Sequence, residues 1–123
     1  MSSIVWSRRL FLRRSGGHNR LVVLEVARLT VAEGRAADFE GAFEQFKAVL
    51  APAPGFQGAE LQRGIERPFE YWLFVHWETV EAHTVDFKQA GGFARWNELV
   101  GPYLAEPPDA VHVQPRTSLQ AAS

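Results

Sequence analysis

A histidine and a tryptophan near the middle of the chain have types and spacing suited to proton transfer beside an aromatic wall. Trp77 ends an apolar run, and His83 follows six residues later in a segment with helical spacing. Imidazole titrates near neutral pH, so a histidine on the inward face of a helix can act as a general base. An indole offers a flat apolar wall and an N–H donor. We therefore expect His83 to act as a catalytic base beside Trp77.

Three further aromatic side chains have the spacing to complete a pocket around this pair. The predicted substrate-binding residues are Trp77, Phe87, Phe93 and Trp96. The competing interpretation is that these rings are simple core packing, which is common for large aromatic residues. For His83, a core role would require a hydrogen bond to a neighbouring carbonyl, because an unpaired polar group is costly to bury.

Other catalytic chemistries lack the residues they need. The chain has no cysteine, which excludes disulfides, thiolate metal sites and cysteine nucleophiles. No two histidines or carboxylates show metal-ligand spacing, and there is no Ser-His-Asp elbow or phosphate-binding glycine loop. We expect no metal. Of the other histidines, His18 lies in a basic segment, His76 points away from Trp77 towards a partner subunit, and His112 lies on the last predicted strand.

The elements that position His83 are a strand and the helix after it. Residues 71–77 are apolar on both faces of a predicted strand. The pattern then changes to helical spacing over residues 79–87, where Thr79 can cap the N-terminus. Val80, His83 and Phe87 fall on one face of this predicted helix.

The rest of the chain alternates between the same two kinds of element. Residues 21–31 predict a first strand, in which Glu25 interrupts one of two apolar faces. Residues 36–51 predict a helix, 56–63 a second strand, and 110–114 a fourth strand. A third helix begins after Gly91-Gly92, and its apolar face is formed by Phe93, Trp96, Val100, Tyr103 and Leu104.

The element order is therefore β-α-β-β-α-α-β, which predicts an α+β, ferredoxin-like split-βαβ fold with a four-stranded antiparallel sheet. Helices cover one sheet face in this arrangement. Because the strands are apolar on both sides, the other face also needs cover. We expect a homodimer that packs sheet against sheet, a dimeric α/β barrel.

Charge divides the chain into a basic extension, residues 1–20, a domain, residues 21–115, and a polar tail, residues 116–123. The extension holds five arginines, and residues 21–123 hold eight basic and fourteen acidic residues, a formal charge of −6. This acidic body argues against nucleic-acid binding, and no apolar run reaches the roughly 20 residues of a membrane span.

Residues 7–13 resemble a twin-arginine export signal but lack the following apolar region and cleavage site. We expect a cytoplasmic protein.

The second half of the chain resembles the antibiotic biosynthesis monooxygenase family, which belongs to the dimeric α/β-barrel superfamily. The resemblance covers about residues 21–115 and is carried by Trp77-Glu78-Thr79, Glu81-Ala82-His83, Phe93-Ala94-Arg95-Trp96 and Pro107-Pro108. It does not specify a reaction, since the superfamily includes quinone-forming monooxygenases, haem-degrading enzymes and isomerases. Function must therefore be argued from the site.

The haem-degrading branch is disfavoured by three replaced residues. Its strand asparagine corresponds to Ala27, its helical tryptophan to a position near Asp86, and its iron-binding histidine to Trp96 or Asn97. The cofactor-free monooxygenases that oxidise phenols to quinones fit better, through Trp77-Glu78. Even so, their tyrosine is replaced by His83.

The resemblance thus implies a small cofactor-independent monooxygenase that acts on a phenolic or hydroquinone-type aromatic. A non-enzymatic, stress-related or ligand-binding dimer that holds an aromatic compound is the alternative, and an isomerase is a third possibility. Oxygen uptake with hydroquinones and anthrones separates the first two. We expect the purified protein to bind neither flavin nor haem tightly.

Overall fold

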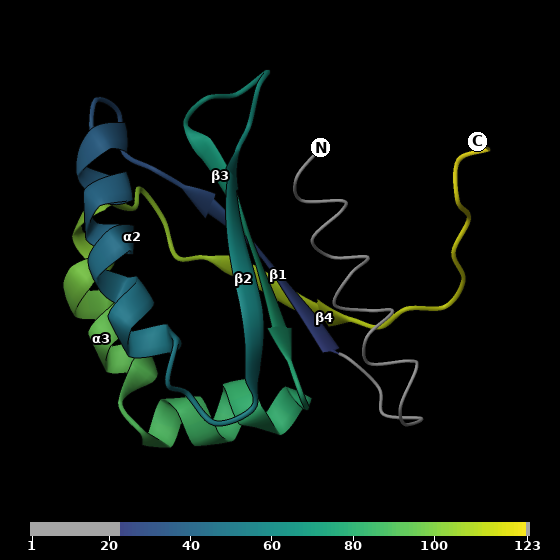
Figure 1. The fold of residues 1–123 in the computed structure, drawn as a ribbon. Coiled ribbons are helices and arrows are strands. Elements are labelled where there is room, and N and C mark those ends of the chain that lie inside the picture. The colour runs from purple at the N-terminus through teal and green to yellow at the C-terminus, as the bar shows by residue number, and fades with distance from the viewer. Residues whose placement is uncertain (1–22, 123) are drawn as a thin grey trace.

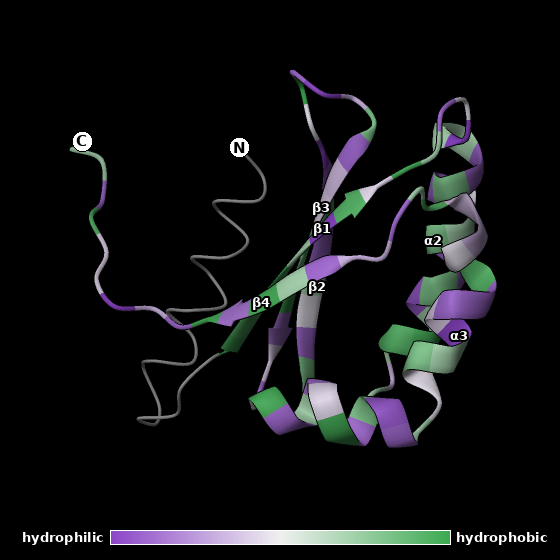
Figure 2. Ribbon diagram, turned by 180° about the vertical axis from the view of Figure 1, so that it is seen from behind, coloured by the Kyte–Doolittle hydropathy of each residue, from purple (hydrophilic) through white to green (hydrophobic). Residues whose placement is uncertain are grey.

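The computed structural model describes residues 23–122 as two layers, a sheet with helices on one of its faces (Figures 1 and 2). The strands are β1 (Val23–Thr30), β2 (Phe56–Arg63), β3 (Glu70–Trp77) and β4 (Asp109–Val113). Their spatial order is β2-β3-β1-β4, and all neighbours are antiparallel. This order confirms the predicted α+β, ferredoxin-like fold. The basic extension and its arginine pair lie outside the described residues.

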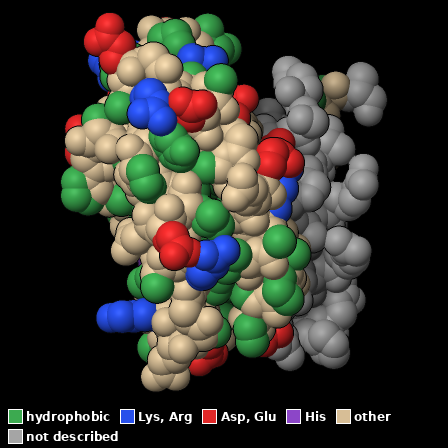
Figure 3. Space-filling model, turned by 90° about the vertical axis from the view of Figure 1, so that its left-hand side faces the viewer, with side chains coloured by type: hydrophobic (Ala, Val, Ile, Leu, Met, Phe, Trp, Pro, Cys, Tyr) green, Lys and Arg blue, Asp and Glu red, His purple; other side chains and the backbone are tan. Residues whose placement is uncertain are grey.

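The helical layer consists of α2 (Ala36–Leu50), the π-helix η1 (Ala82–Phe87), α3 (Gly92–Leu99) and the 3₁₀ helix η2 (Gly101–Tyr103). Helix α2 buries the apolar face that its sequence predicts, formed by Phe39, Ala42, Phe43, Phe46 and Leu50. Phe39 packs against Tyr71 of β3 with ring centroids 4.7 Å apart. Acidic and basic side chains are scattered over the outer side of this layer (Figure 3). No helix among residues 23–122 is long and apolar enough to cross a membrane.

The segment after β3 differs from the regular α-helix predicted for it. Thr79 Oγ1 accepts a 3.0 Å hydrogen bond from the Ala82 N–H, so the predicted cap is confirmed. Residues 82–87 then form a wider, π-helical turn. Val80, two residues before this turn, is 36% exposed, whereas Ala82 is buried. The prediction that Val80 shares the inward face of His83 was wrong.

The third helix is shorter than predicted. Helix α3 ends at Leu99, and Pro102 has no N–H to donate to the carbonyl of Glu98, so the α-helix cannot continue through it. Leu104 is extended and forms an isolated β-bridge with Val31 instead of adding to the helical face. Val100, at the junction, is fully buried.

The two sheet faces differ in cover, although both are apolar as predicted. Side chains of β1 and β3 that face the helices are buried, whereas Leu24, Val26, Trp72 and Phe74 on the opposite face are half-buried. Val111 and Val113 of β4 are 54% and 43% exposed on that face. After β4 the exposed residues 114–122 leave the sheet as an extended arm (Figure 1).

Candidate active site between the sheet and the helices

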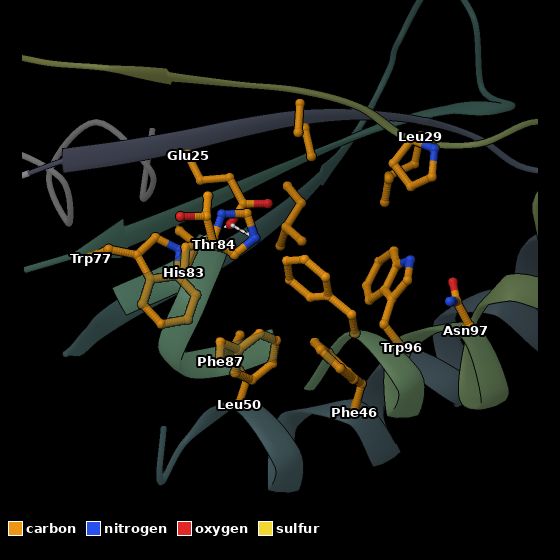
Figure 4. A pocket seen from close by; sticks show the side chains of 16 residues that line it. Glu25, Leu29, Phe46, Leu50, Trp77, His83, Thr84, Phe87, Trp96 and Asn97 are labelled. Carbon is orange, nitrogen blue, oxygen red and sulfur yellow. Dashed lines mark hydrogen bonds and ion pairs between the residues drawn. The ribbon is translucent and has the colours of Figure 1, made fainter. Parts of the chain in front are cut away.

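A cavity of about 410 Å³ lies between the helix-facing side of the sheet and the helical layer. Strands β1 and β3 supply one wall, and α2, η1 and α3 supply the other (Figure 4). The five residues predicted for the site, His83, Trp77, Phe87, Phe93 and Trp96, all line this cavity. The structure therefore brings together, around one space, side chains that are up to 19 positions apart in the chain.

A buried carboxyl group that the sequence analysis did not assign to the site lies at one end of the cavity. Glu25 is 7% exposed because strand alternation places it on the helix-facing side of β1. Its Oε1 accepts a 2.9 Å hydrogen bond from the indole N–H of Trp77. The same oxygen is 3.4 Å from His83 Nε2 (Figure 4). The indole N–H of Trp77 is thus engaged by the protein, and the prediction that it serves as a donor to a ligand finds no support in this geometry.

The imidazole of His83 is enclosed by aromatic rings. It stacks on Trp77 with centroids 5.3 Å apart and an interplanar angle of 18°, and Phe93 meets it edge-on at 5.3 Å. Its Nδ1 lies 2.9 Å from Nε2 of His112. His112 is the cross-strand partner of Glu25 in the β1–β4 pair, so both residues point towards η1. The core interpretation would require a hydrogen bond between His83 and a carbonyl, whereas the observed partner is a ring nitrogen of His112.

Burial shifts the pKa values of Glu25 and His83 in opposite directions. Burial raises the pKa of Glu25 to about 7, and the Trp77 hydrogen bond partly opposes this rise. Burial, followed by the charge of His112, lowers the pKa of His83 to about 4. At neutral pH Glu25 is therefore close to its titration midpoint, whereas His83 is neutral. Glu25, and not His83, has the proton affinity that suits a base near pH 7.

The other end of the cavity is formed by α3. Trp96 meets Phe46 edge-on with centroids 5.0 Å apart, and Asn97 lies beside it (Figure 4). The Asn97 amide can both donate and accept hydrogen bonds. A flat molecule between the two ends would contact aromatic rings along its length and polar groups at its tips.

Four polar residues of this region were not predicted for the site: Glu25, Thr84, Asn97 and His112. Glu25 could have been identified from the sequence, because it is an acidic residue within an apolar strand face and a buried carboxyl group needs a partner.

His76 is also buried, on the opposite sheet face, where burial lowers its pKa. Within residues 23–122, no group of three or more His, Asp and Glu side chains has an arrangement that could hold a metal ion.

Comparison with known proteins assigns the chain to a family. Residues 22–99 match the antibiotic biosynthesis monooxygenase family, and the chain belongs to it. The Bacillus subtilis (strain 168) protein YczJ, itself uncharacterised, is 31% identical over 93 residues, which span 76% of this chain and 98% of YczJ.

Two solved structures show the same fold. A Bordetella bronchiseptica protein that carries the same family name is 42% identical, with a TM-score of 0.76 over 79% of this chain and 99% of that chain. SnoaB, a cofactor-independent oxygenase from Streptomyces nogalater, is 24% identical, with a TM-score of 0.69 over 82% of this chain and 99% of its own. Family membership supports a monooxygenase-like role.

Proposed function

We propose that the protein is a cofactor-independent monooxygenase that oxidises a phenolic or hydroquinone-type aromatic in the cavity beside Glu25. One observation carries this proposal: an aromatic-lined cavity has a carboxyl group at one end whose pKa is about 7. A volume of about 410 Å³ falls within the range of small-ligand pockets. The rings of Phe87, Phe93 and Trp96 provide the substrate contacts.

The chemistry requires a base, an electron-rich aromatic substrate and a site that excludes water. The phenol hydroxyl gives its proton to the Glu25–His83 pair, and the resulting phenolate transfers electrons to O₂. One oxygen atom then becomes bonded to a ring carbon as the new quinone carbonyl, and the other leaves as water. All four electrons that O₂ takes up come from the substrate, so the reaction needs no added reductant. The protein supplies orientation, exclusion of water and proton transfer.

We also propose that the functional unit is a homodimer. The half-buried face formed by Leu24, Val26, Trp72 and Phe74 continues into the exposed Val111 and Val113. Cross-strand pairing places Val111, Val26 and Phe74 in one row. A second sheet packed on this face would bury the row, as in aligned sheet packing.

Oxygen consumption with a panel of hydroquinones, phenols and anthrones tests the proposed reaction. We expect uptake of one O₂ per quinone formed, and ¹⁸O₂ should deliver one labelled atom to the product. Uptake without label in the product would contradict a monooxygenase.

Aromatic-ligand binding without turnover is the alternative function. It is favoured by the engagement of the Trp77 N–H with Glu25, which leaves fewer groups to orient a reacting hydroxyl. Quenching of tryptophan fluorescence by the same panel, with no oxygen uptake, would support it.

A further inference from the structure

We propose that Glu25, His83 and His112 form a proton-transfer chain from the cavity to the outer edge of the sheet, with His112 as its outer terminus. This inference deepens the proposed function and rests on it for its catalytic purpose. Within that reaction Glu25 receives the substrate proton, and the two histidines return it to solvent. His112 does not line the cavity and acts through His83 as a positioning and relay residue.

The contacts between the three side chains run in a row. Glu25 Oε1 lies 3.4 Å from His83 Nε2, and the opposite ring nitrogen of His83 lies 2.9 Å from His112 Nε2. The second distance is that of a direct hydrogen bond. The first is slightly longer, so this step requires a small rotation of His83. Imidazole can pass a proton because it accepts at one nitrogen and donates from the other.

The tautomers of the two histidines give a chain in which every proton is accounted for. With Glu25 ionised, the His83 proton is on Nε2, and His112 donates from its Nε2 to His83 Nδ1. When Glu25 is protonated, its O–H faces His83 Nε2, and His83 donates from Nδ1 to His112. To release that proton, Glu25 gives it to His83 Nε2, His83 gives its Nδ1 proton to His112 Nε2, and His112 loses its own Nδ1 proton to water. Glu25 is then a carboxylate again.

Burial shows why the proton would leave by this route. The side chains of Glu25 and His83 are 9% and 13% exposed, and the His83 ring is bounded by Trp77, Phe87 and Phe93, none of which titrates. Glu25 and His83 are the titratable groups among the residues that line the cavity. His112 lies on the edge strand β4 and is partly exposed. Among residues 23–122, the ionisable side chains in contact with His83 are thus Glu25 from β1 and His112 from β4.

Nitrogen-15 NMR of histidine-labelled, full-length protein tests the chain without any substrate. As pH passes the pKa of Glu25, about 7, we expect the ring-nitrogen signals of both His83 and His112 to report a change of tautomer with one shared midpoint. Glu25→Gln should abolish this shared transition. The signals of His76, on the opposite sheet face, are the internal control and should not respond to Glu25→Gln. Signals of His112 that are unchanged by Glu25→Gln would overturn the chain.

Steady-state kinetics of a His112 variant test the relay once a substrate that the protein oxidises is known. His112→Ala should lower kcat roughly ten- to a hundredfold with little change in KM. Imidazole in the buffer should restore kcat, whereas pyrazole, which has a similar size but is a much weaker base, should not. Equal rescue by both azoles would show that His112 only fills space and would refute the relay. If no aromatic is oxidised, the proposed function fails while the NMR experiment still decides whether the chain exists.

Discussion

Trp77 and Glu25 are joined across strands β3 and β1 by a buried 2.9 Å hydrogen bond from the indole N–H to the carboxylate. Glu25 pairs in register with Val75, so the bond reaches diagonally along the sheet to the end of β3. The same indole stacks on His83. One tryptophan therefore fixes the position of the carboxyl group and the orientation of the imidazole.

Replacing Trp77 with phenylalanine should raise the pKa of Glu25 above about 7, because the lost hydrogen bond favours the ionised form. Above this pKa the variant should also lose about 2 kcal/mol of unfolding free energy, as expected for a hydrogen bond to a charged group. Infrared titration of the carboxyl band and urea unfolding measure the two effects. Trp72→Phe, on the opposite face of the same strand, is the matched control. A Glu25 pKa that is unchanged in Trp77→Phe would contradict the role of this bond.

Glu25 and His83 should make opposite contributions to the pH dependence of stability. The raised pKa of Glu25 stabilises the folded state at low pH, and this contribution is lost between about pH 4.5 and 7. The lowered pKa of His83 has the opposite sign, because the unfolded chain binds the proton more tightly, so stability is gained between about pH 4 and 6.5. Each contribution amounts to about 3 kcal/mol, and the two nearly cancel in the wild type.

Denaturant unfolding of two single variants over this pH window separates these contributions. Relative to wild type, Glu25→Gln should gain stability as pH rises, and His83→Gln should lose it. Parallel curves for the two variants would show that neither pKa is displaced.

Oxygen uptake should depend on the carboxyl group of Glu25. With a good substrate, Glu25→Gln should lower kcat by roughly 10² to 10⁴, the usual contribution of a general base. Glu44→Gln, at an exposed position of α2 that pairs with Lys47, is the control and should keep wild-type kcat. Equal activity of the two variants would remove Glu25 from the mechanism.

His83→Ala distinguishes a cavity role from a core role. If His83 serves the cavity, we expect turnover to be lost with only a modest change in melting temperature. A packed-core role would instead cost about 1–3 kcal/mol through a lost hydrogen bond and a new void. Thermal melting and oxygen uptake decide between these outcomes. A large fall in melting temperature with unchanged activity per folded molecule would exclude the catalytic role.

Sheet-to-sheet dimerisation predicts a dimer in sedimentation experiments at micromolar concentration. Phe74→Lys places a charge on the half-buried sheet face and should shift the protein towards monomer. Val85→Lys adds the same charge at a 41% exposed position of η1 and should leave the dimer intact. A stable wild-type monomer would refute this interface.

Much of the fold follows from local patterns in the sequence. The apolar residues of α2 predict its buried face because they repeat with the period of a helix. The unbroken apolar run of β3 predicts a strand that needs cover on both faces. The site was predicted only in part. Glu25 and His112 meet through strand register, which depends on pairing between segments 87 positions apart in the chain. Nothing in the sequence near either residue specifies that register, so the sequence alone does not predict the contact between His112 and His83.

The π-helical turn of η1 has a consequence for comparing relatives. Such a turn accommodates one more residue than an α-helical turn. A relative that lacks this residue would carry a regular helix and would present a different side chain at the position of His83. An alignment must therefore place its gap within residues 82–87, since a gap elsewhere would equate His83 with a residue that points away from the sheet. Deleting one residue of this turn would likewise displace the imidazole from the Trp77 ring without altering any side chain of the sheet.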